Sequence, residues 1–116
     1  MSSKAAIGAK GEHIAAIYLE KKGYKIIERN YRFKLAEIDL IASIENFIVF
    51  VEVKARSSNK FGHPEEAVNA KKARKVIEGA EHYLEAINWK GNIRFDIIAV
   101  KLGQEIDIQH FEDAFY

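Results

Sequence analysis

Two neighbouring stretches decide the fold: Ala36-Glu37-Ile38-Asp39-Leu40-Ile41 and Phe47-Ile48-Val49-Phe50-Val51-Glu52-Val53-Lys54. Both are rich in aliphatic residues, and a short polar segment lies between them. We therefore predict two strands, Leu35–Ala42 and Phe47–Lys54, joined by a hairpin loop at residues 43–46. The second strand is apolar on both faces as far as Val51, so we expect it in the centre of the sheet.

Acidic side chains interrupt both predicted strands. Because side chains alternate along a strand, Glu37 shares a face with Asp39, and Glu52 shares a face with Lys54. If the two strands are hairpin neighbours, Asp39, Glu52 and Lys54 can converge. An acid in so apolar a strand costs several kcal/mol unless its charge is compensated, and a hard divalent cation would compensate it. Two carboxylates, a backbone carbonyl such as that of Val53 and several waters make an ordinary Mg²⁺ (or Mn²⁺) shell.

Two simpler interpretations of these acids remain open. Asp39 could pair with a nearby arginine at the end of its strand. Glu52 and Lys54 could form a plain ion pair on one face, although such a pair contributes only ~0–1 kcal/mol at a surface. That is a weak reason to place an acid in an apolar strand, so we favour the metal site.

Further elements surround this hairpin. The apolar stripe of the first 22 residues indicates a helix at Gly8–Lys22, stopped by Gly23. A polar loop is expected at residues 55–63, before a long amphipathic helix that begins at Pro64. The remaining predicted elements are a strand at Tyr24–Phe33, the end of the long helix at Ile87, and strands at Ile93–Val100 and Glu105–His110. The order is α-β-β-β-α-β-β, which is an α/β fold in one domain over residues 1–116.

The composition excludes several classes of protein. The chain has 116 residues, of which 48% are hydrophobic and 30% charged, and it contains no cysteine. Disulfides, zinc ribbons and thiol catalysis are therefore excluded. The longest apolar run, Phe47–Val51, is much shorter than the roughly 20 residues of a membrane span, and no secretory core is evident. We expect a cytoplasmic protein that does not bind a membrane.

The charges are segregated along the chain. The net charge is +5 over residues 1–35, −4 over residues 36–53, +5 over residues 54–75 and −5 over residues 76–116. An acidic stretch between two basic ones is what a metal site facing a polyanion would require. The predicted nucleic-acid-binding residues are the bases around the acids: Arg29, Arg32, Arg56, Lys60, Lys71 and Lys75. For each base on the long helix taken singly, a solvated helix face is the alternative.

The pattern Asp39 … Glu52-Val53-Lys54 resembles the D…ExK signature of restriction-endonuclease-like nucleases. The wider sequence resembles the YraN family of bacterial predicted endonucleases, which are similar to archaeal Holliday-junction resolvases. This resemblance covers nearly the whole chain and includes Gly11-Glu12, Gly23-Tyr24, Arg29-Asn30-Tyr31-Arg32, Glu37-Ile38-Asp39-Leu40-Ile41, Phe50-Val51-Glu52-Val53-Lys54-Ala55-Arg56, Phe61-Gly62, Arg94-Phe95-Asp96 and Ala114-Phe115. Two positions depart from the pattern: Ala36 replaces the family's usual Gly, and Ile38 replaces the Pro of the broader signature.

The resemblance carries expectations about fold and function. It implies a three-layer, restriction-endonuclease-like core with a mixed sheet flanked by helices. It implies metal-dependent hydrolysis of phosphodiester bonds in DNA, with branched DNA as a substrate class, and a homodimer, because paired cuts across a junction need two sites. The alternative function is a nucleic-acid-binding module of the same fold that does not cleave efficiently.

The resemblance also assigns residue roles. It makes Asp39, Glu52, Lys54 and Glu12 the catalytic residues, and Asp39, Glu52 and Glu12 the metal ligands. On its own chemistry Glu12 could equally be a first-turn acid favoured by the helix dipole, or a solvated residue.

Overall fold

The centre of the molecule is an antiparallel hairpin of β2 (Ala36–Ile44) and β3 (Phe47–Arg56). The computed structural model describes residues 4–57 and 70–114 of the chain. The predicted four-residue loop is wrong, because β2 continues to Ile44 and the turn contains only residues 45 and 46. Ile44 packs against the hydrophobic core, which extends the strand, and Glu45 has a φ of 51° in the tight turn.

Three further strands complete a mixed sheet. They are β1 (Lys25–Phe33), β4 (Asn92–Lys101) and β5 (Asp107–Phe111), and the strand order is β1-β2-β3-β4-β5. Strands β3 and β4 run parallel, whereas the other neighbours are antiparallel. The prediction that the Phe47 strand is central is confirmed. Its residues 48–53 are all buried, as expected for a strand covered on both faces.

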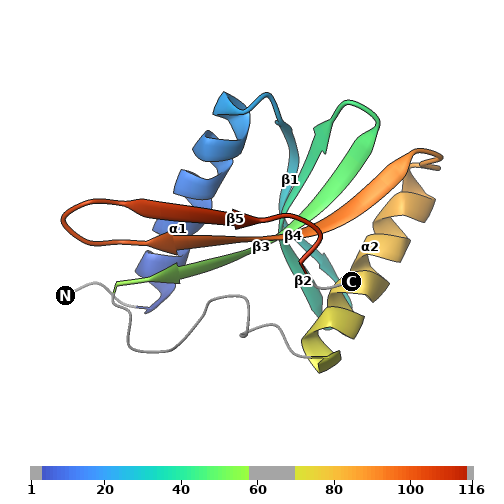
Figure 1. The fold of residues 1–116 in the computed structure, drawn as a ribbon. Helices are drawn as coiled ribbons and strands as arrows, with labels where there is room; N and C mark the ends of the chain where they lie inside the picture. Colours follow the sequence, from blue (N-terminus) through green and yellow to red (C-terminus); the bar gives the residue numbers. More distant parts are fainter. Residues whose placement is uncertain (1–3, 58–69, 115–116) are drawn as a thin grey trace.

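A helix covers each face of the sheet. Helix α1 (Lys4–Lys21) packs on one face and α2 (Ala70–Ala86) on the other, so the molecule has three layers (Figure 1). The element order α-β-β-β-α-β-β and the predicted α/β class are confirmed. Within residues 4–57 and 70–114, neither helix is long and apolar enough to cross a bilayer.

Several predicted boundaries move in the structure. Helix α1 begins at Lys4, before the predicted Gly8, because the intervening residues continue the helix. It ends at Lys21, and Gly23 follows with a φ of 96°, as the predicted stop requires. Strand β3 continues through Ala55 and Arg56, where the sequence predicts a loop. The first part of the predicted long helix, residues 64–69, lies outside the described residues, as does Lys60.

Gly11 sets the distance between α1 and β3. It is buried, and a Cβ atom at this position would collide with the Cβ of Ala55 on β3. The absence of a side chain therefore lets the helix backbone approach the strand closely. Because Glu12 follows directly, this close approach brings its carboxylate to the same region of the sheet as the acids of β2 and β3.

Candidate active site

Asp39 lies where the backbone pairing of β2 and β3 stops. The last paired residues are Leu40 and Val51, and beyond them Oδ2 of Asp39 accepts a hydrogen bond from the backbone N–H of Val53 at 2.8 Å. The carboxylate thus takes the place of a backbone acceptor. Ile38 packs beneath α2 and Leu40 beneath α1, so the alternation of side chains changes at this point of β2.

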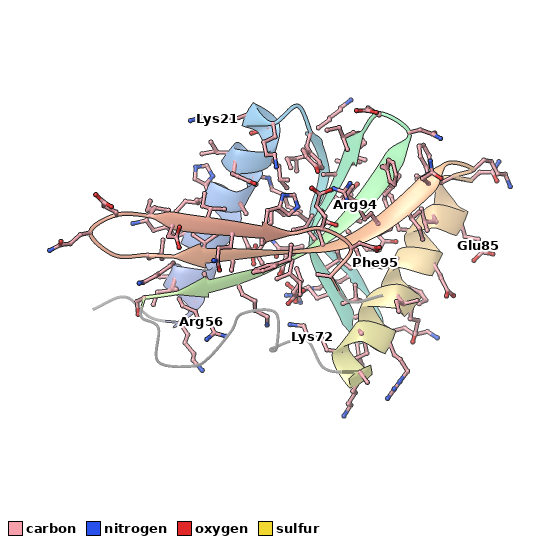
Figure 2. The ribbon with its side chains drawn as sticks, viewed as in Figure 1. Lys21, Arg56, Lys72, Glu85, Arg94 and Phe95 are labelled. Carbon is pink, nitrogen blue, oxygen red and sulfur yellow. The ribbon has the colours of Figure 1, made fainter. Side chains whose placement is uncertain are left out.

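Glu52 is the buried acid of β3, with only 5% of its surface exposed. Its Oε1 forms an ion pair with Lys72 from the beginning of α2, which Figure 2 shows beside the sheet. Lys54, two residues along the same strand, places its Nζ 3.6 Å from Glu52 Oε1. The predicted same-face arrangement of Glu52 and Lys54 is therefore confirmed, and a second lysine joins them.

A cleft of about 250 Å³ opens between the sheet and α2. Asp39 and Glu52 both line it, so the hairpin brings the two predicted carboxylates to one cavity. Its remaining lining residues are Leu35, Glu37, Lys72, Lys75 and Val76. The cleft therefore presents acids from the strands opposite bases from the helix.

The two carboxylates differ in electrostatic environment. Burial, together with the negative charge of Glu52, raises the pKa of Asp39 to about 8, against a weaker opposing effect of the Val53 amide and Lys72. Burial alone would lower the pKa of Lys72, but its hydrogen bond to Glu52 raises that pKa above the ordinary value. Burial and the neighbouring Lys72 lower the pKa of Lys54. The negative charge of Glu52 is thus compensated by lysine side chains, whereas burial and the charge of Glu52 destabilise the charged form of Asp39.

Glu12 approaches the site from α1. In the amide orientation that satisfies its neighbours, Nδ2 of Asn30 donates to Glu12 at 3.1 Å and to Glu37 at 3.3 Å. Burial raises the pKa of Glu12, and the negative charges of Glu37 and Glu52 add to this effect. Glu12 therefore feels the acids of the cleft through space, and Asn30 bridges it to Glu37.

Carboxylate oxygens fit a hard divalent cation. The structure offers two such ligands, Asp39 and Glu52, where the resemblance implies three. Within the described parts of the chain, no three His, Cys, Asp or Glu side chains gather closely enough to hold a metal ion. The structure thus brings together Asp39 and Glu52 but does not add Glu12 to them. Mg²⁺ is commonly bound through one or two carboxylates and retained water, so Asp39 and Glu52 fit it as a pair.

The predicted nucleic-acid-binding bases occupy different places around the cleft. Arg29 and Arg32 are exposed on β1, and Arg32 forms an ion pair with Glu37 at 3.4 Å. Lys75 lines the cleft, whereas Lys71 on the same helix is exposed. Lys60 lies outside the described residues.

Arg56 stands apart from these bases, at the end of β3 (Figure 2). With Lys54 and Lys4 it lines a second cavity of about 500 Å³ between the strand and the start of α1. Its Nη1 is buried and has no hydrogen-bond partner within residues 4–57 and 70–114. A buried charged donor is costly without an acceptor, so the guanidinium is suited to binding an anion.

Sequence reasoning missed the role of Lys72. From the sequence, a solvated helix face is the expected place of a base on this helix, yet Lys72 neutralises the buried Glu52. Its position gives the signal that could have found it. Lys72 precedes the buried Val76 by one helical turn and Gly79 by two, so it lies on the stripe that faces the sheet.

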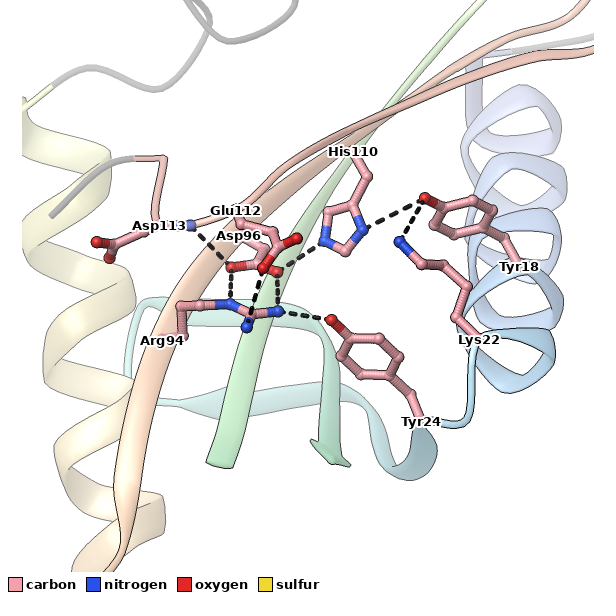
Figure 3. Close-up of polar contacts among 8 residues, drawn as sticks. All are labelled: Tyr18, Lys22, Tyr24, Arg94, Asp96, His110, Glu112 and Asp113. Carbon is pink, nitrogen blue, oxygen red and sulfur yellow. Dashed lines mark hydrogen bonds and ion pairs between the residues drawn. The ribbon is translucent and has the colours of Figure 1, made fainter. Parts of the chain in front are cut away.

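A separate polar cluster occupies the opposite face of the sheet (Figure 3). The fully buried carboxylate of Asp96 accepts two hydrogen bonds from Arg94, each of 2.9 Å, and pairs with His110 at 2.7 Å. The backbone N–H of Asp113 donates to it at 3.0 Å, and Arg94 also donates to the hydroxyl of Tyr24 at 2.6 Å. These contacts join β4, β5 and Tyr24, which directly precedes β1. The motif Arg94-Phe95-Asp96 therefore holds the fold together on the face remote from the cleft.

The mixed sheet, the covering helix on each face and the paired acids of β2 and β3 define an α/β protein with an acid-and-lysine cleft. A model of the uncharacterised protein family UPF0102 matches residues 11–100, and the chain belongs to this family. The resemblance to the YraN family is thereby confirmed. Relatives include UPF0102 proteins from Cytophaga hutchinsonii and Caldanaerobacter subterraneus subsp. tengcongensis. The first is 48% identical over 92% of this chain and 93% of its own, and the second 52% identical over 89% and 85%.

One solved structure resembles the chain weakly. It is Pyrococcus furiosus SfsA in complex with Ca²⁺, with 19% sequence identity and a TM-score of 0.29. The match covers 93% of this chain and 61% of the SfsA chain. A TM-score this low carries no argument about fold or function.

Proposed function

We propose that this protein is a metal-dependent nuclease that hydrolyses phosphodiester bonds in DNA. The observation that carries the proposal is that Asp39 and Glu52 line one cleft at the end of the central hairpin, with Lys54 Nζ 3.6 Å from Glu52. Asp39 is a half-buried carboxyl whose charge is opposed by burial and by Glu52. A divalent cation between the two carboxylates would remove that opposition.

Each residue of the site has a distinct task in this proposal. Asp39 and Glu52 would hold Mg²⁺ or Mn²⁺, which would supply Lewis acidity to the reaction. Lys54 orients the attacking water and neutralises negative charge that develops on the scissile phosphate. Lys72 pairs with Glu52 in the structure. When DNA binds, its side chain would move so that the ammonium group contacts a phosphate oxygen in place of that carboxylate. Glu12 tunes the site through its charge, because it lies outside the carboxylate pair.

The basic residues bind the remaining phosphates. Arg56 lies on β3, and Lys71 and Lys75 lie on α2. Arg29 and Arg32 lie on the edge strand β1. Contacts of this kind are independent of sequence and weaken steeply as salt concentration rises. We expect each phosphate contact to contribute about −0.9 to the slope of log K against log salt on duplex DNA. A flat salt response would contradict this role.

The test is single-turnover cleavage of a panel of branched, single-stranded and duplex DNA with Mg²⁺ or Mn²⁺. Lys54→Ala should lower the cleavage rate about a hundredfold or more and leave DNA affinity nearly unchanged, because it removes a transition-state contact. Arg56→Ala should do the opposite. Lys90→Ala, which removes an exposed base outside the predicted DNA-binding set, is the control for loss of one positive charge. If Lys54→Ala cleaves at the wild-type rate, Glu52 and Lys54 form only an ion pair.

One observation favours a second function, that of a DNA-binding module without efficient cleavage. Lys72 and Lys54 already compensate Glu52, so the buried acid has structural partners without a metal. A wild-type protein that binds the panel tightly but cleaves none of it, with either metal ion, would establish this second function over the first.

We also propose that the active form is a homodimer acting on branched DNA, since two cuts across a junction need two sites. Light scattering at micromolar concentration should give a dimer mass, alone or with a four-way junction. A monomer mass that does not change on adding DNA would contradict the dimer.

A further inference from the structure

Leu35 is the most exposed large hydrophobic residue in the described part of the chain, with 85% of its surface accessible. It lies in the two-residue turn between β1 and β2, and Lys34 beside it has a φ of 55°. A leucine stabilises a fold when its side chain is buried. Because Leu35 is exposed, its side chain contributes little to folding. The turn also borders the cleft that contains Asp39 and Glu52.

The hairpin that carries Leu35 is held firmly against α2. The ring of Phe33 stacks on His82 with a centroid distance of 3.9 Å and an interplanar angle of 14°. His82 Nδ1 also lies 2.7 Å from the hydroxyl of Tyr31. A short turn on an anchored hairpin presents its tip with little loss of freedom on binding.

The surroundings of the tip are basic. Arg32 and Lys34 flank it on the hairpin, and both are exposed. Across the cleft, Lys75 extends from α2. Leu35 is thus an isolated apolar side chain between cationic side chains, and it lies beside the acidic cleft. Some DNA-binding proteins insert such a leucine between nucleobase steps while lysine and arginine side chains hold the phosphates.

We propose that Leu35 is a wedge that enters the base stack of DNA next to the phosphate lying in the cleft. This inference rests on the proposed function, because it requires DNA at the Asp39–Glu52 cleft. It adds a specificity determinant. Inserting the leucine into an intact duplex costs the free energy of unstacking a base step, whereas a step that is already interrupted does not carry this cost. DNA with an unpaired or mismatched base near the cleft should therefore bind more tightly than intact duplex.

The test measures unstacking directly, without cleavage. Duplexes carrying one 2-aminopurine at successive positions are titrated with protein in EDTA, because the fluorescence of this base rises when it leaves the stack. Wild-type protein should raise the signal, and Leu35→Ser should abolish the rise. Ile106→Ser is the matched control, since Ile106 is 51% exposed and lies outside the cleft. Leu35→Met, which keeps an apolar wedge, should restore the signal.

The second measurement is the ratio of affinities for a duplex with one unpaired base and for intact duplex. We expect about a tenfold preference in wild type, a fraction of the cost of unstacking one step, and a ratio near one for Leu35→Ser. Because Leu35 is exposed, its replacement should leave the fold intact. Wild-type protein that binds DNA without any 2-aminopurine response would overturn the wedge and leave the proposed nuclease function standing. Absence of DNA binding would overturn both, and a Leu35→Ser effect on protein mass alone would assign the tip to a protein interface.

Discussion

Replacing Asp39 with asparagine should remove most of the pH dependence of stability that arises in the cleft. Burial and the charge of Glu52 raise the pKa of Asp39 from an ordinary 3.8 to about 8. The folded state therefore holds a proton that the unfolded chain releases. The stability that comes from this proton is fully present below about pH 4 and is lost as the pH rises through about 8. Asparagine has no such proton and can still accept the hydrogen bond from Val53.

The size of the effect follows from the shift. A change from 3.8 to about 8 corresponds to roughly 6 kcal/mol at about 1.4 kcal/mol for each pKa unit. Solvent reaches part of the Asp39 carboxyl, which makes this an upper limit. We expect wild type to lose a few kcal/mol of unfolding free energy between about pH 5 and pH 9, and Asp39→Asn to lose much less.

The assay is urea unfolding across this pH range, with and without Mg²⁺. A bound cation at 100 times its dissociation constant should stabilise wild type by about 3 kcal/mol, most strongly above pH 7, and Asp39→Asn hardly at all. Glu37→Gln is the control, because Glu37 lines the same cleft but is exposed. Parallel pH profiles for wild type and Asp39→Asn would refute the electrostatic reasoning. Equal stabilisation by Mg²⁺ in both proteins would refute the metal site.

Further predictions concern packing, the polar cluster and the competing lysine. Gly11→Ala should cost about 1–3 kcal/mol in urea unfolding because its Cβ collides with β3, whereas Gly8→Ala, with nothing within 4 Å, should gain up to about 1 kcal/mol. Asp96→Asn should cost about 3 kcal/mol or more, because it removes the buried negative charge that pairs with both Arg94 and His110, and cleavage by the folded fraction should be unchanged. Lys72→Met should tighten Mn²⁺ binding measured by calorimetry, because the ammonium no longer competes for its carboxylate partner on β3; Lys71→Met, one residue away and exposed, is the control. Equal Mn²⁺ affinities in these two variants would show that the lysine and the metal do not compete.

The central hairpin could be predicted because its signals are local. Val49 and Val51 face one helix while Phe50 faces the other, and an apolar run of this length is readable from the sequence as a buried strand. Gly23 likewise terminates α1 through the backbone conformation that glycine adopts most easily. In both cases the residues that specify the element are neighbours in the chain.

The partner of Glu52 could not be predicted in this way. Lys72 is 20 residues away, on another element, and a lysine on an amphipathic helix ordinarily faces water. Only the rotation of α2 about its own axis, relative to the sheet, brings the ammonium of Lys72 to the buried carboxylate. That rotation is set by packing contacts such as Val76 and Tyr83 against the sheet, which sequence periodicity alone does not orient toward a particular acid.

Asp39 and Asp96 are acids on strands of one sheet, and the fold treats them in opposite ways. Burial alone would raise the pKa of Asp96, but hydrogen bonds from His110, Arg94 and a backbone amide lower it below the ordinary value. Within the described residues Asp39 has no ion pair, and its pKa is raised. The fold itself thus supplies cations to Asp96. The contrast is the physical reason for proposing a metal at Asp39 and for proposing none at Asp96.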